Sequence, residues 1–269
     1  MENKKREQQL KKLSDNKHYY GKFGKQFLSN SDVYTLLYNE EQYGCKRKET
    51  DKMLKGRYFH TLVLEPKLKD TFLIAPCPTR RQKVYTEFIN ENGLEIALTQ
   101  SEAQAVEEQV EWFLSKDNEK LHKNMIADRS IADFIHDKKA LKEQPGIEEI
   151  DGIEFKGKAD MISNEIILDF KTTENVRRFP QAVKYDSSYD TQAYIYQQIF
   201  KLPFVFIVVG NTQKQYADGT KYYEIGIHAA TDEVILRGKN KTLEAIKRYK
   251  GHMDGTRNVK QFIYNTILT

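Results

Sequence analysis

The sequence predicts an α/β protein in which a helical N-terminal portion leans on a C-terminal part built around a sheet. Apolar residues recur at helical intervals through most of the first 145 positions. From about residue 146 they alternate or run continuously, which is typical of strands. The chain is organised around two of these strands, over 157–160 and 165–171, because each of them carries a carboxylate.

The expected N-terminal helices begin and end at recognisable residues. Ser29-Asn30-Ser31-Asp32 offers an N-cap, Pro66 stops a helix, and Thr99-Gln100-Ser101-Glu102 has the form of a capping box. The second helix carries His60 and also Gly56, whose cost to helix stability hints at a close approach by backbone or ligand. The expected helices cover residues 33–38, 50–65, 99–114 and 129–141.

The C-terminal part is expected to hold the sheet. Asp151-Gly152 lies between alternating runs and predicts a hairpin turn. The continuous β-branched and aromatic run over 204–209 predicts a buried strand. The expected strands cover 147–150, 153–162, 166–171, 204–209 and 222–228, and two further helices cover 187–200 and 232–249.

The totals exclude several classes of protein. The chain has 269 residues, 39% hydrophobic and 30% charged, which is typical of a soluble globular protein with a solvated surface. No apolar run approaches the roughly 20 residues that cross a bilayer, and the start lacks the apolar centre of a signal peptide, so we expect a cytoplasmic protein. Cys45 and Cys77 are too few for a disulfide scaffold or an iron–sulfur cluster.

No linker is long enough to enforce two independent domains. We expect a basic N-terminal arm over 1–28 and one domain over 29–269, with a helical part at about 29–145, an α/β core at about 146–250 and a tail at 251–269. The net charge of +4 is mild, but the first 25 residues carry eight lysines and arginines with three interleaved aromatic residues. This arm either follows a phosphate backbone or is a solvated terminus.

Asp160 and Asp169 are nine positions apart, one on each of two neighbouring expected strands. If the strands pair around Ser163-Asn164, the two carboxylates lie close together and repel, and a cation is the natural reason to place them so. Hard carboxylate oxygens select Mg²⁺, with Mn²⁺ as a substitute. The simplest alternative is a pair of surface carboxylates.

Lys171 follows Asp169 by two positions and therefore points to the same face of its strand. Beside a metal it could orient or deprotonate an attacking water and offset charge on a phosphate in the transition state. As an isolated tripeptide, Asp-x-Lys is common by chance, and a simple salt bridge would explain it.

The wider context makes this pattern specific. Gly157-Lys158-Ala159-Asp160, then the run over 167–173 and then Gln192–Tyr196 together resemble the PD-(D/E)XK nuclease superfamily in its RecB-like form. The segment over 56–66 narrows the likeness to the exonuclease VIII (RecE-type) nucleases of phages and prophages. The resemblance covers roughly residues 30–250 and implies a restriction-endonuclease-like core, with a mixed central β-sheet flanked by helices.

The resemblance also implies roles for individual residues. His60 would help to bind metal, Asp160 and Asp169 would be ligands assisted by the backbone carbonyl of Phe170, and Lys171 would be catalytic. Position 169 carries Asp rather than Glu, which the RecB-like branch permits.

On the following helix, Gln192 and Tyr196 would face the site from one side. The cysteine cluster of the iron–sulfur branch is missing, which excludes that subgroup.

Each of these roles has a structural alternative. His60 could be a core histidine, and Gln192 and Tyr196, at i and i+4, could be a helix-face pair that packs on the sheet. Either Glu148 or Glu149 could add a ligand or be a solvated acid.

The basic loop before residue 84 has two interpretations as well. Its cations could grip phosphates of a substrate strand or could belong to an ordinary charged loop. They are Arg80, Arg81 and Lys83.

The expected function is a Mg²⁺-dependent exodeoxyribonuclease that degrades linear double-stranded DNA from its ends, 5′ to 3′, for phage-type recombination. By resemblance we expect a homotrimeric or homotetrameric ring, a single-strand annealing protein as partner, and a phage or prophage origin in a bacterial host. The alternatives are a non-catalytic DNA-end-binding protein on a nuclease fold and an endonuclease of the same superfamily.

Overall fold

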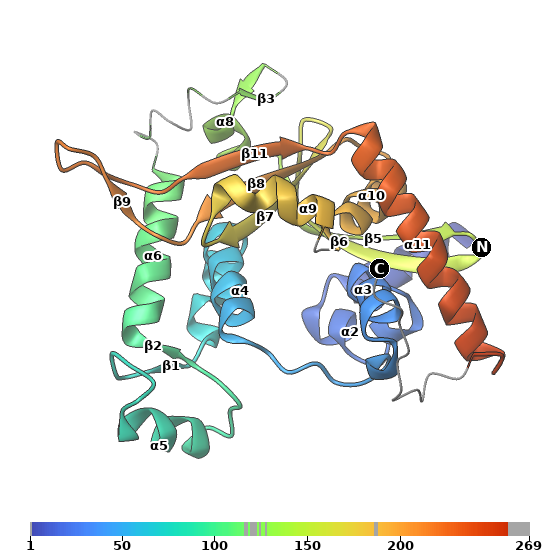
Figure 1. Ribbon diagram of the computed structural model, residues 1–269, viewed down its shortest axis with the longest axis horizontal. Helices are drawn as coiled ribbons and strands as arrows, with labels where there is room; N and C mark the ends of the chain where they lie inside the picture. The colour runs from blue at the N-terminus through green and yellow to red at the C-terminus, as the bar shows by residue number, and fades with distance from the viewer. Residues whose placement is uncertain are drawn as a thin grey trace, which may run out of the picture.

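A mixed five-stranded sheet forms the centre of the computed structural model (Figure 1). The structure describes residues 2–115, 118, 123, 125, 126, 128–185 and 188–257. The strand order is β11-β8-β7-β6-β5, and only the β7–β8 pair is parallel. The strands are β5 (Leu141–Ile150), β6 (Ile153–Ser163), β7 (Ile166–Thr173), β8 (Phe204–Gly210) and β11 (Ile225–Ala229). The expected α/β fold with a mixed central sheet is thus confirmed.

The predicted hairpin connects β5 to β6. Asp151 and Gly152 have φ angles of 51° and 79°, the left-handed conformation that two-residue hairpin turns require. The parallel pair needs a longer crossover. That crossover carries α9 (Phe179–Tyr185) and α10 (Tyr189–Phe200), which return the chain from β7 to β8.

Helices cover both faces of the sheet (Figure 1). One face packs against α4 (Asp51–Leu64) and α6 (Gln100–Leu114), with a buried cluster that includes Phe59, Phe113 and Phe170. The other face packs against α3 (Asn30–Tyr38), α10 and α11 (Asp232–Met253). The remaining helices are α1 (Glu2–Leu13), α2 (Asn16–Tyr20), α5 (Lys83–Glu91) and α8 (Ile131–Ile135).

Short elements complete the described chain. The 3₁₀ turns are η1 (Gly24–Gln26), η2 (Glu40–Gln42), η3 (Pro66–Thr71) and η4 (Val176–Arg178). The two-residue strands are β1 (Ile74–Ala75), β2 (Leu98–Thr99), β3 (Met125–Ile126), β4 (Arg129–Ser130), β9 (Lys214–Gln215) and β10 (Lys221–Tyr222).

The expected caps are present at the helices that frame the sheet. The side chain of Thr50 accepts the N–H of Met53 at the start of α4, and Thr99 forms a complete capping box with Glu102. Pro66 follows the C-cap residue Glu65, as its lack of an N–H predicts. The sequence therefore sets the limits of α4, the helix that carries His60.

The prediction of a helix over 129–141 is wrong. Only Ile131–Ile135 is helical, and the chain has already entered β5 at Leu141. Leu141 and Lys142 pair with Ile162 and Met161, so the sheet ladder overrides the helical spacing of the apolar residues.

The strand expected over 222–228 is also interrupted. Its residues are divided between β10, which pairs with β9, and β11, which pairs with β8. The helix expected over 187–200 begins at Tyr189, and Ser187 lies outside the described residues.

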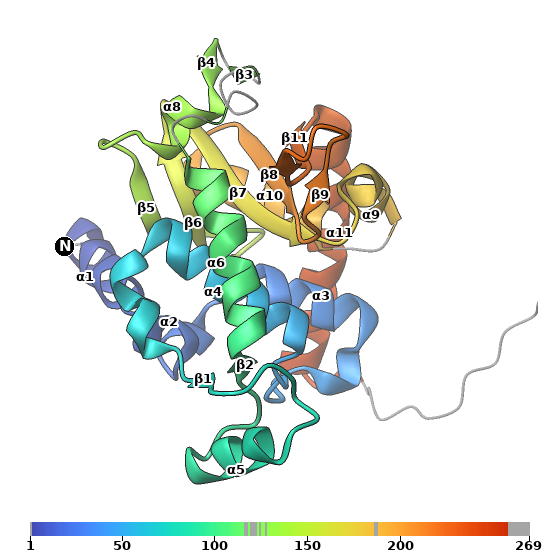
Figure 2. The same ribbon diagram turned by 90° about the vertical axis from the view of Figure 1, so that its left-hand side faces the viewer.

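The described part of the expected N-terminal arm is folded. Leu13, Tyr19 and Phe27 form a buried cluster with Ile147 of β5, and α1 and α2 lie on the β5 side of the molecule (Figure 2). At the other end, α11 runs to Met253, and 258–269 of the expected tail lie outside the described residues. Among the described helices, none combines the length and apolar character needed to span a membrane.

Candidate active site

The β6–β7 ladder ends where the two carboxylates face each other. The last paired residues are Met161 and Leu168, so Asp160 and Asp169 are the next opposed positions. In place of a ladder bond, the Phe170 N–H donates to Asp160 Oδ2 at 2.8 Å. The Asp160 side chain therefore lies in the gap between the diverging strands. Because the N–H and C=O of a strand residue face the same neighbouring strand, the Phe170 carbonyl faces this gap too.

The pleat of β6 is interrupted at the same point. Ala159 packs in the cluster beneath α10, whereas Met161 packs in the opposite cluster beneath α4 and α6. Residues two positions apart in a regular strand share one face, so the alternation slips at Asp160. Across the ladder, Glu143 has a φ of 49° and falls between the pairs Lys142–Met161 and Gln144–Ala159. Such local irregularities re-aim side chains beside functional sites.

His60 reaches this gap from helix α4, which packs on one face of the sheet. It lies in the second half of α4, and its Nδ1 is 3.3 Å from Asp160 Oδ2. Burial lowers the pKa of His60, but the charge and hydrogen bond of Asp160 outweigh it and the net shift is upward. Burial raises the pKa of Asp160, yet His60 and Lys171 turn the net shift downward. The pair therefore favours an ionised Asp160.

Asp169 and Lys171 lie on one face of β7, as their spacing predicts. Lys171 Nζ forms an ion pair with Asp169 Oδ2, and Gln192 Nε2 donates to Asp169 Oδ1 at 2.6 Å. The Asp169 side chain is 1% exposed. Strand β7 and helix α10 thus hold this carboxylate from two sides.

Burial dominates the pKa of Asp169. Burial raises its pKa to about 6; Lys171 acts against this rise and Asp160 adds to it. Burial lowers the pKa of Lys171, but Asp169 and Asp160 outweigh it and raise the pKa above its usual value. Lys171 is therefore an ammonium, but His60 and Lys171 together do not outweigh the effect of burial on Asp169.

The donor set fits a divalent cation. Two carboxylates, an imidazole and the Phe170 carbonyl supply hard oxygen ligands and one nitrogen, the preference of Mg²⁺ or Mn²⁺. A cation would also offset the burial and the charge of Asp160, which together raise the pKa of Asp169. Over the described part of the chain, no three His, Cys, Asp or Glu side chains already meet in the arrangement of a metal site. Asp169 is turned toward Lys171 and Gln192 instead.

Tyr196 supports the site without touching either carboxylate. Its hydroxyl accepts the N–H of Lys158 at 3.3 Å, and burial raises its pKa well above the usual value. The ring packs against Gly157, where an added Cβ would lie 2.9 Å from Tyr196 Cε1 and 2.8 Å from Ile199 Cδ1. Tyr196 therefore fixes the distance between α10 and strand β6.

Glu143 is the carboxylate that the motif spacing did not single out. Its Oε2 lies 3.6 Å from Lys158 Nζ, and burial and the charge of Asp160 raise its pKa to about 7. Of the two acids expected nearby, Glu148 instead forms an ion pair with Lys201, and Glu149 is exposed. The hairpin register contains the missing signal, because it places Glu143 opposite Asp160.

The basic loop lies apart from these residues. Arg80 pairs with Asp51, the first residue of α4, and with Glu102 of α6. Asp51 and His60 are nine residues apart on α4, which corresponds to roughly 13 Å along the helix. Lys83 pairs with Glu87, and Arg81 is exposed.

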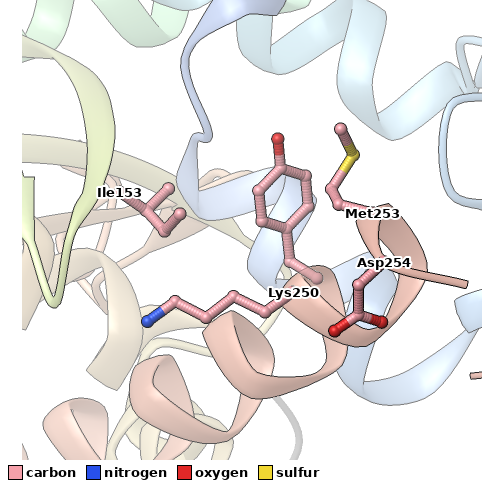
Figure 3. Close-up of a pocket in the computed structure, with 5 residues that line it drawn as sticks. Ile153, Lys250, Met253 and Asp254 are labelled. Carbon is pink, nitrogen blue, oxygen red and sulfur yellow. The ribbon is translucent and has the colours of Figure 1, made fainter. Parts of the chain in front are cut away.

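A shallow hollow lies elsewhere on the molecule. It has a volume of about 570 Å³ and lies between the start of β6 and the end of α11 (Figure 3). Its lining residues are Ile153, Tyr249, Lys250, Met253 and Asp254, none of which belongs to the expected site.

Comparison with known proteins supports the fold and the family of the chain. No curated protein matches the sequence. A solved structure from Eubacterium rectale, described as a "putative exonuclease", superposes with a TM-score of 0.60 at 14% identity, over 94% of this chain and 96% of that chain. At that identity the likeness shows a shared fold. Residues 24–261 match the model of the PDDEXK-like domain of unknown function DUF3799. The chain is a member of this PDDEXK-like family.

Proposed function

We propose that the protein is a metal-dependent exodeoxyribonuclease that hydrolyses phosphodiester bonds at the ends of linear double-stranded DNA. PDDEXK nucleases generally use divalent ions, most often Mg²⁺, and the residues at the site suit such an ion. The observation that carries the proposal is the convergence on one strand gap of His60, Asp160, Asp169 and Lys171. The RecE-type likeness of the motifs favours digestion from ends, 5′ to 3′.

In this proposal each side chain has one task. Asp160, Asp169, His60 and the Phe170 carbonyl would hold the divalent ion, which would supply Lewis-acid polarisation of the scissile phosphate. Lys171 remains protonated beside two carboxylates, so it orients the attacking water and stabilises negative charge that develops on the phosphate.

The surrounding residues fix that arrangement. Gln192 fixes the orientation of Asp169 through its amide. Residues 166–170 of β7 are buried, which limits competing water and strengthens these electrostatic interactions.

Two alternatives remain distinct from this proposal. A DNA-end-binding protein on the same fold would have no use for two buried acids, Asp160 and Asp169, at one gap between strands. An endonuclease would use the same chemistry but would cut closed circles. A ring-shaped homotrimer or homotetramer, a single-strand annealing partner and a role in phage recombination belong to the proposal through the motif likeness.

The test is digestion of end-labelled linear duplex and closed circular DNA in Mg²⁺ and in Mn²⁺. We expect linear DNA to be degraded from its ends and circles to be spared. Lys171→Ala should lower kcat/KM by about 100- to 1,000-fold while circular dichroism shows an unchanged fold. Lys46→Ala is the matched control, because Lys46 forms an exposed ion pair with Glu95. Intact linear DNA with both ions across a broad pH range would refute the nuclease.

A further inference from the structure

The N-terminal module (residues 2–28) is fastened to the catalytic strand β6. Leu28 N–H donates to the Glu154 carbonyl at 3.0 Å, and Lys156 N–H donates to the Leu28 carbonyl at 2.8 Å. Arg6 adds an ion pair with Glu154 at 2.9 Å. The module is thus joined by backbone bonds to the strand that, a few residues later, carries Asp160.

Two buried lysines fix the module more closely. Lys156 Nζ donates to the Tyr19 carbonyl, and Lys158 Nζ donates to Asn16 Oδ1, each at 2.5 Å. Both ammonium groups also lie over the Tyr19 ring, at 4.4 and 4.8 Å from its centroid. The backbone at Gly24 lies close to Tyr19, and only glycine permits this contact, because an added Cβ would lie 1.8 Å from the Tyr19 carbonyl oxygen. Helix α2 therefore has a defined position beside the site.

Tyr20 is the residue that this arrangement presents outward. It packs edge-on against Tyr19, with ring centroids 5.0 Å apart, yet remains 72% exposed. Tyr20 directly follows Tyr19, whose ring lies beneath Lys158 Nζ, and Lys158 precedes Asp160 by two residues on β6. An anchored, exposed ring contributes little to stability, but it is preorganised to stack.

The module that carries Tyr20 is basic in composition. The module carries eight lysines and arginines against three acidic residues. Lys17, Lys22 and Lys25 are exposed within five positions of Tyr20. Proteins that hold nucleic-acid strands combine such cations, which follow the phosphates, with aromatic side chains on which bases stack.

We propose that Tyr20 is a stacking platform for a nucleobase of the DNA strand whose phosphate enters the Asp160–Lys171 site. This inference rests on the proposed nuclease function. Tyr20 acts as a positioning residue: it touches a base next to the cleaved linkage and sets where the strand lies, while the bond-breaking groups remain those of β6 and β7. The exposed lysines of the module hold the same strand by its phosphates.

The test measures stacking separately from hydrolysis. In a Lys171→Ala background, 2-aminopurine is placed in turn at each end nucleotide of a duplex, and its fluorescence and the Kd are recorded. We expect quenching at one position, lost in Tyr20→Leu together with a roughly 5- to 150-fold weaker Kd. Tyr20→Phe should retain both. With Lys171 intact, Tyr20→Leu should raise KM more than it lowers kcat.

Tyr38→Leu is the matched control, since Tyr38 is 49% exposed at the end of α3 and packs against Tyr34. Quenching and Kd should be unchanged in this variant. If Tyr20→Leu behaves like the control while the parent protein still digests linear DNA, the proposed stacking role of Tyr20 is wrong and the proposed nuclease function is unaffected. If the parent protein neither binds nor digests DNA, the proposed function fails and this inference fails with it.

Discussion

Gln192 holds Asp169 by a hydrogen bond of 2.6 Å from its side-chain amide to Oδ1, while Lys171 pairs with the other oxygen of the same carboxylate. Helix α10 and strand β7 are distant in sequence order from α4, yet the three elements meet at one gap in the sheet. The orientation of Asp169 therefore depends on a residue that makes no direct contact with Asp160 or His60 among the described interactions.

Gln192→Leu tests this dependence. The substitution replaces the side-chain amide that donates to Asp169 with an apolar side chain that helix α10 accommodates. The carboxylate should therefore lose its fixed orientation. Residues that orient metal ligands typically contribute about 10- to 100-fold, and we expect kcat to fall by that factor with a higher Mg²⁺ requirement. Steady-state digestion of linear duplex over a Mg²⁺ titration measures both. Gln198→Leu on the same helix is the control; equal losses in the two variants would contradict a specific role.

The pH dependence of stability should report the buried acids. The pKa of Glu143 rises from 4.5 to about 7 and that of Asp169 from 3.8 to about 6. The folded protein then binds more protons than the unfolded chain between about pH 4 and about pH 7, so the free energy of unfolding should fall as pH rises through this window. Glu143 alone accounts for up to about 3 kcal/mol. The lowered pKa of Asp160 acts in the opposite sense and at lower pH.

Urea unfolding in EDTA across this window measures the effect. Glu143→Gln should flatten the upper half of the curve, because the amide does not titrate. Glu148→Gln is the control, as Glu148 forms an exposed ion pair with Lys201 away from the site. A stability that instead rises between about pH 5 and about pH 7 would show that these carboxyls are not buried as described. Added Mg²⁺ should restore stability at neutral pH.

Two glycine-to-alanine exchanges should have opposite signs. At Gly157 a Cβ would press into Tyr196 and Ile199, so Gly157→Ala should push α10 from the sheet and cost about 1–3 kcal/mol. At Gly56 a Cβ would meet only Thr172 Oγ1, at 3.7 Å, so the helix gains up to about 1 kcal/mol. Thermal unfolding of both variants provides the measurement. Two changes of the same sign would contradict the described packing.

The sequence predicted the parts of the fold that depend on local signals. The Asp151-Gly152 turn, the Thr99 capping box and the stop at Pro66 each follow from one or two residues, and all are present. The helix expected over 129–141 failed because the spacing of its apolar residues also suits a strand paired with β6. Because glycine destabilises a helix, Gly56 suggested a close approach by backbone or ligand. Among the residues that the structure describes, no backbone of another element lies close to Gly56.

The sequence predicted which residues form the site, but it did not predict how their side chains are oriented. Spacing predicted that Asp160, Asp169 and Lys171 lie together, and the family resemblance added His60. The slip in the pleat of β6 that turns Asp160 into the gap leaves no local pattern in the sequence. Glu143 could have been found, because the predicted hairpin turn already fixes it opposite Asp160. The anchoring of α2 by Lys156 and Lys158 could not, since it joins residues more than 130 positions apart.

Asp190 should be the most sensitive polar residue outside the catalytic gap. It is fully buried at the start of α10 and receives Arg237 Nε at 2.9 Å and Lys241 Nζ at 2.7 Å, both from α11. Asp190→Ala leaves two half-buried cations facing each other and should cost about 3–5 kcal/mol in urea unfolding. Because α10 also carries Gln192, hydrolysis should decline in parallel. Exposed Asp232→Ala, in the first turn of α11, is the control.

A compensated variant separates charge from packing at this contact. Combining Asp190→Leu with Arg237→Met and Lys241→Leu removes the ion cluster as a whole, and such replacements are often neutral or stabilising. We expect stability and DNA hydrolysis to return toward the parent values, since α10 is then held by apolar contacts with α11. If the Asp190→Ala variant unfolds at the same urea midpoint as the parent protein, these ion pairs do not hold α10 in place. Recovery of stability without recovery of hydrolysis would instead show that the position of Gln192 requires Asp190 itself.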